Sequence, residues 1–227
     1  MIKITNKSVF NSGCDLIVNT INCHGVMGAG IALEFSLRYP QMFNQYKHDC
    51  EKGVVKTGKT YLYCENGQKI LNFPTKDNDP RSPSLIKYIE EGLKYFSKHY
   101  KEYNITSVAF PPLGCSNGKL NFDEEVKPLM INVLENIDDL EILICLNEMP
   151  LEGLEKQMTE KLKTLEACTF KECFSNDEDY LKFCDRFKNI DRFSQLGSKK
   201  YLPTENVYRN IWQLVYGIVK GDTNYEI

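Results

Sequence analysis

Two short apolar runs constrain this chain most, because each leads into a glycine-rich segment and then into a helical pattern. Residues 15–19 precede the segment 23–30 (Cys-His-Gly-Val-Met-Gly-Ala-Gly), and residues 105–110 precede 111–118 (Pro-Pro-Leu-Gly-Cys-Ser-Asn-Gly). A short apolar run closed by turn residues is typical of a buried parallel strand. The pattern therefore predicts repeated strand–loop–helix units, which favours an α/β layer fold.

Glycine-rich segments in this position suit a phosphate ligand. Glycine lets the backbone approach a ligand and turn its N–H groups inward, and a following helix N-terminus adds a positive dipole end. Each segment alone is also compatible with a tight strand-to-helix turn. The first is not a dinucleotide fingerprint, since Leu33 stands where the third glycine belongs, and no Gly-Lys-Ser/Thr follows as in a Walker loop.

The remaining pattern completes the α/β layout. Residues 60–64 and 69–73 predict a hairpin, and residues 142–146 a further strand. Ser82 and Pro83 predict the start of a helix with an apolar stripe. The stripe comprises Leu85, Ile86, Ile89, Leu93 and Phe96. Beyond about residue 147 only helical patterns occur, at 151–165, 180–187 and 207–218, which predicts an all-helical extension.

Charge and cysteine usage exclude several classes of protein. Because 28 basic and 31 acidic residues give a net charge of -3, the composition argues against nonspecific duplex binding as the main task, whereas a small anion or one modified nucleotide fits. Nine cysteines without a C-x-x-C pair indicate reduced core thiols and a cytoplasmic protein. Three histidines, none at finger-like spacing from a cysteine, favour no metal site. No run is long and apolar enough to suggest a membrane span.

Three motifs in order carry a specific resemblance. They are Val18-Asn-Thr-Ile-Asn22 with Gly25-Val-Met-Gly-Ala-Gly-Ile-Ala-Leu-Glu-Phe35, Asn72-Phe-Pro-Thr-Lys76, and Phe110-Pro-Pro-Leu-Gly-Cys-Ser-Asn-Gly-Lys-Leu120. Together they resemble the macrodomains of the terminal ADP-ribose protein glycohydrolase and of the DarG-type DNA ADP-ribosyl glycohydrolases. The resemblance implies a three-layer α/β/α macrodomain with a central mixed sheet at residues 1–147. Residues 148–227 would form the helical C-terminal extension, packed on or next to it.

The resemblance also implies a site. Lys76 matches the family's nucleophile, which attacks the anomeric carbon of the distal ribose, and no cofactor or metal is expected. Each of these residues also has an interpretation without a catalytic or binding role. Lys76 could be a solvated lysine in a polar loop, and Asn22 could satisfy a turn. Cys115 could be a small packing residue, and His24 a loop donor or an exposed side chain. The residues implied to bind ADP-ribose are Asn22, Gly25, Val26, Met27, Gly28, Ala29, Gly30, Ile31, Thr75, Leu113, Gly114, Cys115, Ser116, Asn117 and Gly118.

Three departures leave the substrate open. Gly118 stands where the protein-directed branch of the subclass has a catalytic aspartate, whereas DarG-type enzymes have glycine there. The DNA-directed branch usually has histidine and tryptophan just after the lysine, but this chain has Asp77-Asn-Asp-Pro80. Asn6-Lys7 replaces the acidic residue that holds adenine in many macrodomains, so adenine is expected to be anchored differently or more weakly.

The function expected from the resemblance is an ADP-ribosyl hydrolase that removes mono-ADP-ribose from modified DNA bases or from protein carboxylates. One alternative is an ADP-ribose reader without turnover. Another is an antitoxin whose helical tail binds a cognate ADP-ribosyltransferase toxin. The expected partners are ADP-ribose as ligand and product, ADP-ribosylated DNA or protein as substrate, and that transferase in the antitoxin case. A monomer without membrane association is expected.

Overall fold

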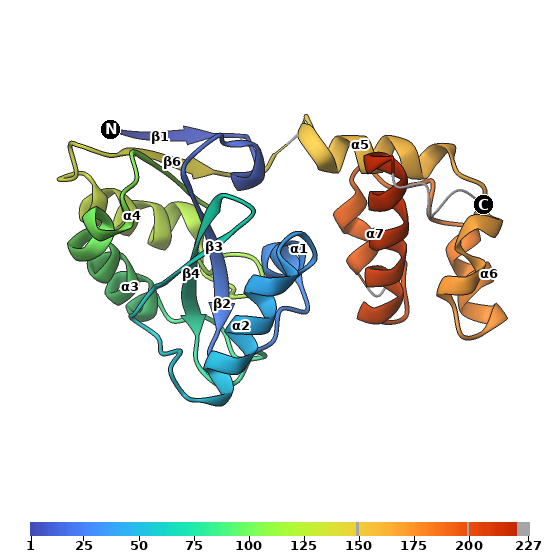
Figure 1. The fold of residues 1–227 in the computed structure, drawn as a ribbon, viewed down its shortest axis with the longest axis horizontal. Helices are drawn as coiled ribbons and strands as arrows, with labels where there is room; N and C mark the ends of the chain where they lie inside the picture. Colours follow the sequence, from blue (N-terminus) through green and yellow to red (C-terminus); the bar gives the residue numbers. More distant parts are fainter. Residues whose placement is uncertain (149, 199, 222–227) are drawn as a thin grey trace. The chain divides into compact units, whose positions relative to one another are not determined.

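The computed structural model describes residues 1–148, 150–198 and 200–221, and the chain divides into two compact units. The first unit is Met1–Met149, and the second is Pro150–Ile227 (Figure 1). Each unit has its own buried apolar core. The two units are therefore described separately.

A six-stranded mixed sheet forms the centre of the first unit. Its strands, in spatial order, are β1 (Ile2–Thr5), β6 (Glu141–Cys145), β5 (Ser107–Phe110), β2 (Leu16–Asn22), β4 (Gln68–Lys76) and β3 (Tyr61–Glu65). All neighbouring strands are parallel except β3 and β4, which form the antiparallel hairpin predicted around Asn66 and Gly67. β2 lies between β4 and β5, so the segments that leave these three strands emerge side by side.

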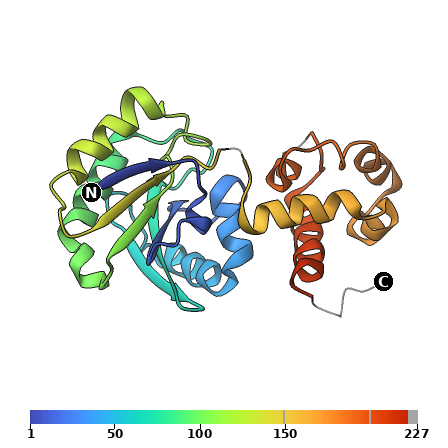
Figure 2. The same cartoon turned by 90° about the horizontal axis from the view of Figure 1, so that it is seen from above.

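Helices cover both faces of this sheet, as Figures 1 and 2 show. α1 (Gly30–Arg38) and α2 (Pro40–Glu51) lie on one face, and α3 (Ile86–His99) and α4 (Lys127–Leu134) lie on the other. Alternation along β2 produces the two cores, since successive side chains of a strand point to opposite faces. Leu16 and Val18 pack in the core under α3 and α4, whereas Ile17 and Ile21 pack in the core under α1 and α2. The three-layer α/β/α prediction is confirmed.

One helix begins later than the sequence predicts. Ser82 and Pro83 indicate a start near residue 83, but α3 begins at Ile86, with an uncapped Leu85 in extended conformation before it. The backbone N–H of Ser84 instead donates to the carbonyl of Gly118 at 2.9 Å, which holds residues 82–85 as a loop. As a result Leu85 and Ile86 are exposed, and the buried stripe consists of Ile89, Leu93 and Phe96.

The second unit is helical throughout the part that the structure describes. Its helices are α5 (Gly153–Thr164), α6 (Asp177–Cys184) and α7 (Glu205–Lys220), with short 3₁₀ turns at Ala167–Cys173 and Phe193–Gly197. Asn176 caps α6, and Thr204 caps α7. The rings of Phe170, Phe183 and Phe187 meet in the core of this unit. In the residues described, no helix has both the length and the apolar character needed to cross a membrane.

The cysteines are free thiols in varied surroundings. Cys14, Cys23 and Cys145 are buried, as expected of small core residues, but Cys64 and Cys168 are exposed. Burial raises the pKa of the Cys145 thiol to about 12, and that of Cys115 to about 11. Thiols with raised pKa values are protonated at neutral pH and are poor nucleophiles.

Candidate functional site

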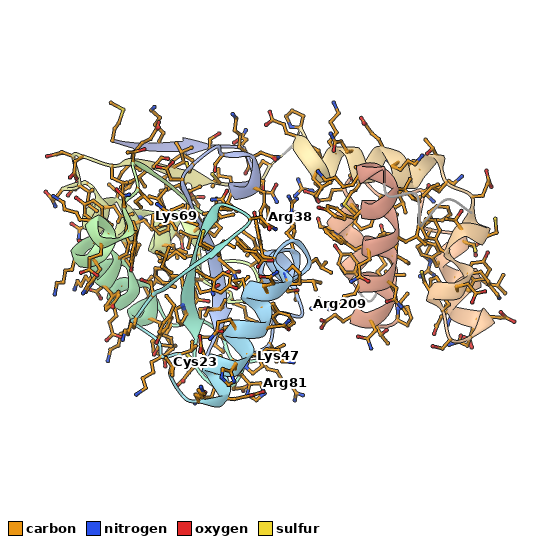
Figure 3. The ribbon with its side chains drawn as sticks, viewed as in Figure 1. Cys23, Arg38, Lys47, Lys69, Arg81 and Arg209 are labelled. Atoms are coloured by element: carbon orange, nitrogen blue, oxygen red, sulfur yellow. The ribbon has the colours of Figure 1, made fainter. Side chains whose placement is uncertain are left out.

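Three segments meet at the carboxyl edge of the sheet. The first loop (residues 23–29) follows β2, Thr75 and Lys76 end β4, and the second loop (residues 111–118) follows β5. Because β2 pairs with both β4 and β5, these segments are neighbours, and Asn22 lies in register with Lys76. Figure 3 labels Cys23, where the first loop begins, at the same end of the unit as Lys47 of α2. In open α/β sheets this edge is where ligands bind.

Asn22 shapes the first loop with its side chain. Its Nδ2 donates to the carbonyl of Val26 at 2.6 Å, and its Oδ1 accepts from the backbone N–H of His24 at 2.9 Å. The hydroxyl of Tyr46 also donates to Asn22, reaching the carbonyl oxygen at 2.8 Å and Oδ1 at 3.0 Å. Burial raises the pKa of Tyr46 far above its usual value, so this hydroxyl stays a donor. In this structure the side chain of Asn22 therefore stabilises the turn at the start of the first loop.

At two positions, one in the first loop and one at the start of α1, the backbone conformation favours glycine. Gly25 has φ +88° and lies against Cys50 and Lys47 of α2. Gly30 has φ +57°, and a Cβ there would lie 2.9 Å from Nδ2 of Asn117 in the second loop. Other residues rarely adopt such positive φ angles. The first residue of α1 thus lies close to Asn117 of the second loop.

The N-terminus of α1 is open between these loops. Its N-cap is Ala29, which has no side chain to accept a hydrogen bond, and its first turn has no acidic residue. Unsatisfied N–H groups at such a helix end attract anions. Val26, Ala29 and Gly30 are exposed there, Gly28 and Ile31 are half-buried, and Met27 points into the core.

The second loop is tightly folded around its glycines. Gly114 has φ +71°, and its carbonyl accepts from the N–H of Leu120 at 3.1 Å. A Cβ on Gly118 would lie 2.2 Å from the carbonyl oxygen of Gly114 and 2.3 Å from Oγ of Ser84. Real Cβ atoms do not approach so closely, so this backbone excludes any side chain at position 118. Leu113 is buried, Cys115 is half-buried, and Ser116 and Asn117 are exposed.

The side chain of Lys76 forms hydrogen bonds to two neighbouring loops. Its Nζ donates to the carbonyl of Asn117 at 2.8 Å and to that of Pro80 at 3.0 Å, and the residue is only 9% exposed. Burial lowers the pKa of Lys76, the positive charge of Lys119 lowers it further, and the charge of Asp79 opposes both. Thr75, beside it, is buried, and its hydroxyl donates to the carbonyl of Ile21. Lys76 is thus an amine held between the second glycine loop and the loop that follows β4.

The loop after Lys76 is ordered by its own aspartate. Oδ1 of Asp79 accepts from the backbone N–H of Arg81 at 2.9 Å, and Oδ2 accepts from the hydroxyl of Ser82 at 3.0 Å. These bonds lower the pKa of Asp79. The N–H of Cys23 donates to the carbonyl of Asp77 at 3.3 Å, which ties this loop to the start of the first glycine loop.

Four residues that support the site are not among the expected catalytic or binding residues, although two of them lie within the quoted motifs: Asn19, Tyr46, Asn72 and Ser84. Nδ2 of Asn19 donates to Oδ1 of Asn72 at 2.9 Å, in a buried pair between β2 and β4. Ser84 is buried beneath the second loop, and within the described residues its Oγ has no hydrogen-bond partner. An asparagine inside each of two apolar strands could have predicted that the two side chains pair, because buried amides need hydrogen-bond partners.

Known proteins that are similar to this chain agree with this architecture. The Macro domain family model matches residues 18–128. A DNA ADP-ribosyl glycohydrolase of Mycobacterium tuberculosis is 40% identical over 149 residues, which are 63% of this chain and 42% of that protein. One of Thermus aquaticus is 35% identical over 148 residues, 63% of this chain and 41% of that protein. The chain therefore spans about two fifths of the length of these relatives.

Solved structures agree with this match. The macrodomain of Mycobacterium tuberculosis DarG is 38% identical with a TM-score of 0.61, covering 64% of this chain and 97% of that one. The Thermosipho africanus DarTG in complex with ADP-ribose is 29% identical with a TM-score of 0.60, covering 66% of this chain and 43% of that one. This chain belongs to the macrodomain family, and its first unit is related to the macrodomains of DarG-type DNA ADP-ribosyl glycohydrolases.

Proposed function

We propose that this chain is a glycohydrolase that removes ADP-ribose from DNA, with the amine of Lys76 as the nucleophile. One observation carries the proposal: a buried lysine of lowered pKa ends β4 and donates to the second glycine loop, at the sheet edge from which both glycine loops leave. The names of the relatives, DNA ADP-ribosyl glycohydrolase, support the activity and the substrate.

The diphosphate of ADP-ribose would bind between the two loops. The uncapped N-terminus of α1 offers N–H groups and a positive dipole end, and the glycines of the second loop allow the backbone to face the same phosphates. That the Thermosipho africanus DarTG was solved with ADP-ribose supports this class of ligand. The distal ribose would then extend toward Lys76.

The reaction follows from an amine placed at the anomeric carbon. Unprotonated Lys76 attacks C1 of the distal ribose, and the bond from C1 to the base nitrogen breaks with its electron pair leaving on the base. The base takes the proton that the alkylated amine loses. The sugar ring opens to give a Schiff base on Lys76, and water then adds, releasing ADP-ribose and restoring the lysine. The sum is one water consumed for one glycosidic bond broken.

The second loop favours DNA over protein as substrate. Protein-directed members of the resembled subclass use an aspartate at the position of Gly118. The contacts of Gly114 and Ser84 leave no room there even for a methyl group. Without a carboxylate from this loop, the attack on the distal ribose depends on Lys76.

A DNA ADP-ribosyltransferase would supply this substrate. The Thermosipho africanus relative, 31% identical over 156 residues, is a fusion of a DNA ADP-ribosyl transferase with a DNA ADP-ribosyl glycohydrolase. That arrangement supports a transferase as the partner of this chain. The helical second unit lies wholly outside the macrodomain match, so it is the candidate for binding such a partner.

The first test compares wild type with Lys76→Ala on an ADP-ribosylated oligonucleotide and on a protein ADP-ribosylated at glutamate, with ADP-ribose affinity measured in parallel. We expect wild type to release ADP-ribose from the oligonucleotide only, and Lys76→Ala to bind ADP-ribose without release. Borohydride during turnover should leave a covalent ADP-ribosyl adduct on Lys76, detectable by mass. Tight binding by wild type without release from either substrate would instead identify a reader.

A further inference from the structure

Lys119 is unusual among the residues that adopt a left-handed backbone. Thirteen described residues have positive φ, of which nine are glycines and three are Asn66, Asn104 and Asn147. Glycine adopts this conformation freely and asparagine tolerates it, whereas other side chains are strained there. Lys119, at φ +64°, is the one that remains. Residues with a strained backbone cluster at active sites and ligand-binding sites, so the conformation of Lys119 suggests a functional role for this residue.

The place of Lys119 in the fold suggests what that role is. It directly follows the second loop, and its N–H donates to the carbonyl of Ser116 at 3.3 Å. It is two residues from Asn117, whose carbonyl accepts from Lys76, and its charge is close enough to lower the pKa of Lys76. The side chain is exposed, and no described residue forms an ion pair with it. An ammonium without an ion pair among the described residues therefore acts electrostatically on the amine proposed to react.

The reacting end of ADP-ribose carries the leaving group. In the proposed reaction Lys76 attacks the distal ribose at its bond to the base, so the base and the strand that carries it lie on the Lys76 side of the site. A single strand entering there brings phosphates on either side of the modified nucleotide. Asp79, the carboxylate whose charge acts on Lys76, accepts hydrogen bonds from the Arg81 N–H and the Ser82 hydroxyl.

We propose that Lys119 is a specificity-determining residue that binds a backbone phosphate next to the ADP-ribosylated nucleotide of a single DNA strand. This inference rests on the proposed function for its substrate. It adds that the enzyme recognises the strand as well as the ADP-ribose, through one charge presented by the end of the second loop. The alternative source of a phosphate, the diphosphate of ADP-ribose itself, is distinguished by the test.

The test measures binding with the full chain in a Lys76→Ala background, which prevents turnover. Three probes are compared: a single-stranded oligonucleotide with one ADP-ribosylated base, the corresponding ADP-ribosylated nucleoside, and free ADP-ribose. Lys119→Gly removes the charge and suits the left-handed backbone, and Lys119→Gln removes the charge while keeping a long side chain. Lys98→Gln is the matched control, since Lys98 is exposed, lacks an ion pair among the described residues, and lies near the far end of α3.

Both Lys119 variants should bind the oligonucleotide about three- to ten-fold more weakly, with the slope of log affinity against log salt reduced by about 0.7. Binding of the nucleoside and of free ADP-ribose should not change, and Lys98→Gln should match the parent. Equal losses on all three probes would show that Lys119 holds the diphosphate and would overturn the proposal. So would unchanged binding of the oligonucleotide, or a parent protein that binds the oligonucleotide no better than the nucleoside. Because these are binding measurements, they stand whether or not wild type hydrolyses either probe.

Discussion

The Nζ of Lys76 donates a hydrogen bond to the carbonyl oxygen of Asn117, 2.8 Å away, and so links the end of β4 to the loop after β5. A second bond to the carbonyl of Pro80 leaves the amine surrounded by backbone oxygens. The amine must be unprotonated to attack, so its pKa decides when it is reactive.

The rate of ADP-ribose release should rise with pH, with an apparent pKa below the 10.5 of an ordinary lysine. Burial lowers the pKa of Lys76, the charge of Lys119 lowers it further, and Asp79 raises it. Asp79→Asn should therefore move the midpoint of the rate profile down, and Lys119→Gln should move it up. Single-turnover release from an ADP-ribosylated oligonucleotide, measured across the pH range, gives these midpoints. Shifts in the same direction for both variants would contradict the charge argument.

The same lowered pKa predicts how the stability of the protein changes with pH. Between the lowered folded pKa of Lys76 and 10.5, the unfolded chain binds more protons at this lysine than the folded chain. The contribution of Lys76 to the free energy of unfolding should therefore rise with pH across that window and level off above it. Urea unfolding of wild type and Lys76→Met at several pH values isolates this contribution. A difference between the two that does not change with pH would contradict it.

Gly118→Ala should destabilise the first unit and weaken ADP-ribose binding. The added methyl would lie 2.2 Å from the carbonyl of Gly114, so the second loop must move. Overpacking of this kind costs about 1–3 kcal/mol of unfolding free energy. Gly197→Ala is the control, since a methyl there meets only ordinary contacts with Tyr208. If both variants unfold alike and bind ADP-ribose like wild type, position 118 tolerates a side chain.

Ser84→Ala should leave the ligand-free protein as stable as wild type or stabilise it. The hydroxyl of Ser84 is buried without a partner among the described residues, and an unpaired buried hydroxyl costs about 1–3 kcal/mol. Its backbone bond to Gly118 is retained in the variant. Thr75→Val is the contrasting control, because the Thr75 hydroxyl donates to Ile21 and its loss should cost about 1 kcal/mol. Urea unfolding of both variants decides between these effects, and equal losses would mean that Ser84 has a partner such as water.

Most of the fold was predictable because it follows local patterns. Short apolar runs gave the central strands, the Asn66-Gly67 turn gave the β3–β4 hairpin, and period-3.6 stripes gave the helices of both units. The late start of α3 was not predictable. Ser82 and Pro83 form a correct local signal for a helix start, but the bond from Ser84 to Gly118 joins residues 34 positions apart. A long-range contact of this kind has no local trace in the sequence.

The site, like the fold, could be predicted from the sequence only where it depends on local patterns. The positions of both loops and of Lys76 follow from strand ends and motifs, and the assignment of these residues to ADP-ribose binding stays a prediction. The turn role of Asn22 was one of the two interpretations of that residue, but its donor Tyr46 comes from a helix that packs against the loop, and this contact could not be predicted. The strain at Lys119 is invisible in the sequence, because a lysine after glycine carries no conformational signal.

A fragment of residues 1–149 should fold and bind ADP-ribose without the second unit. The two cores of the first unit draw their buried side chains from residues 9–145, and the helical unit has a separate core around Phe170 and Phe183. A unit with its own core can fold alone. The fragment should unfold in one cooperative transition and bind ADP-ribose within about two-fold of the full chain, as calorimetry would measure. A fragment that is unfolded, or that folds without binding, would mean that residues after 149 complete the first unit, and the boundary predicted near residue 147 would be wrong.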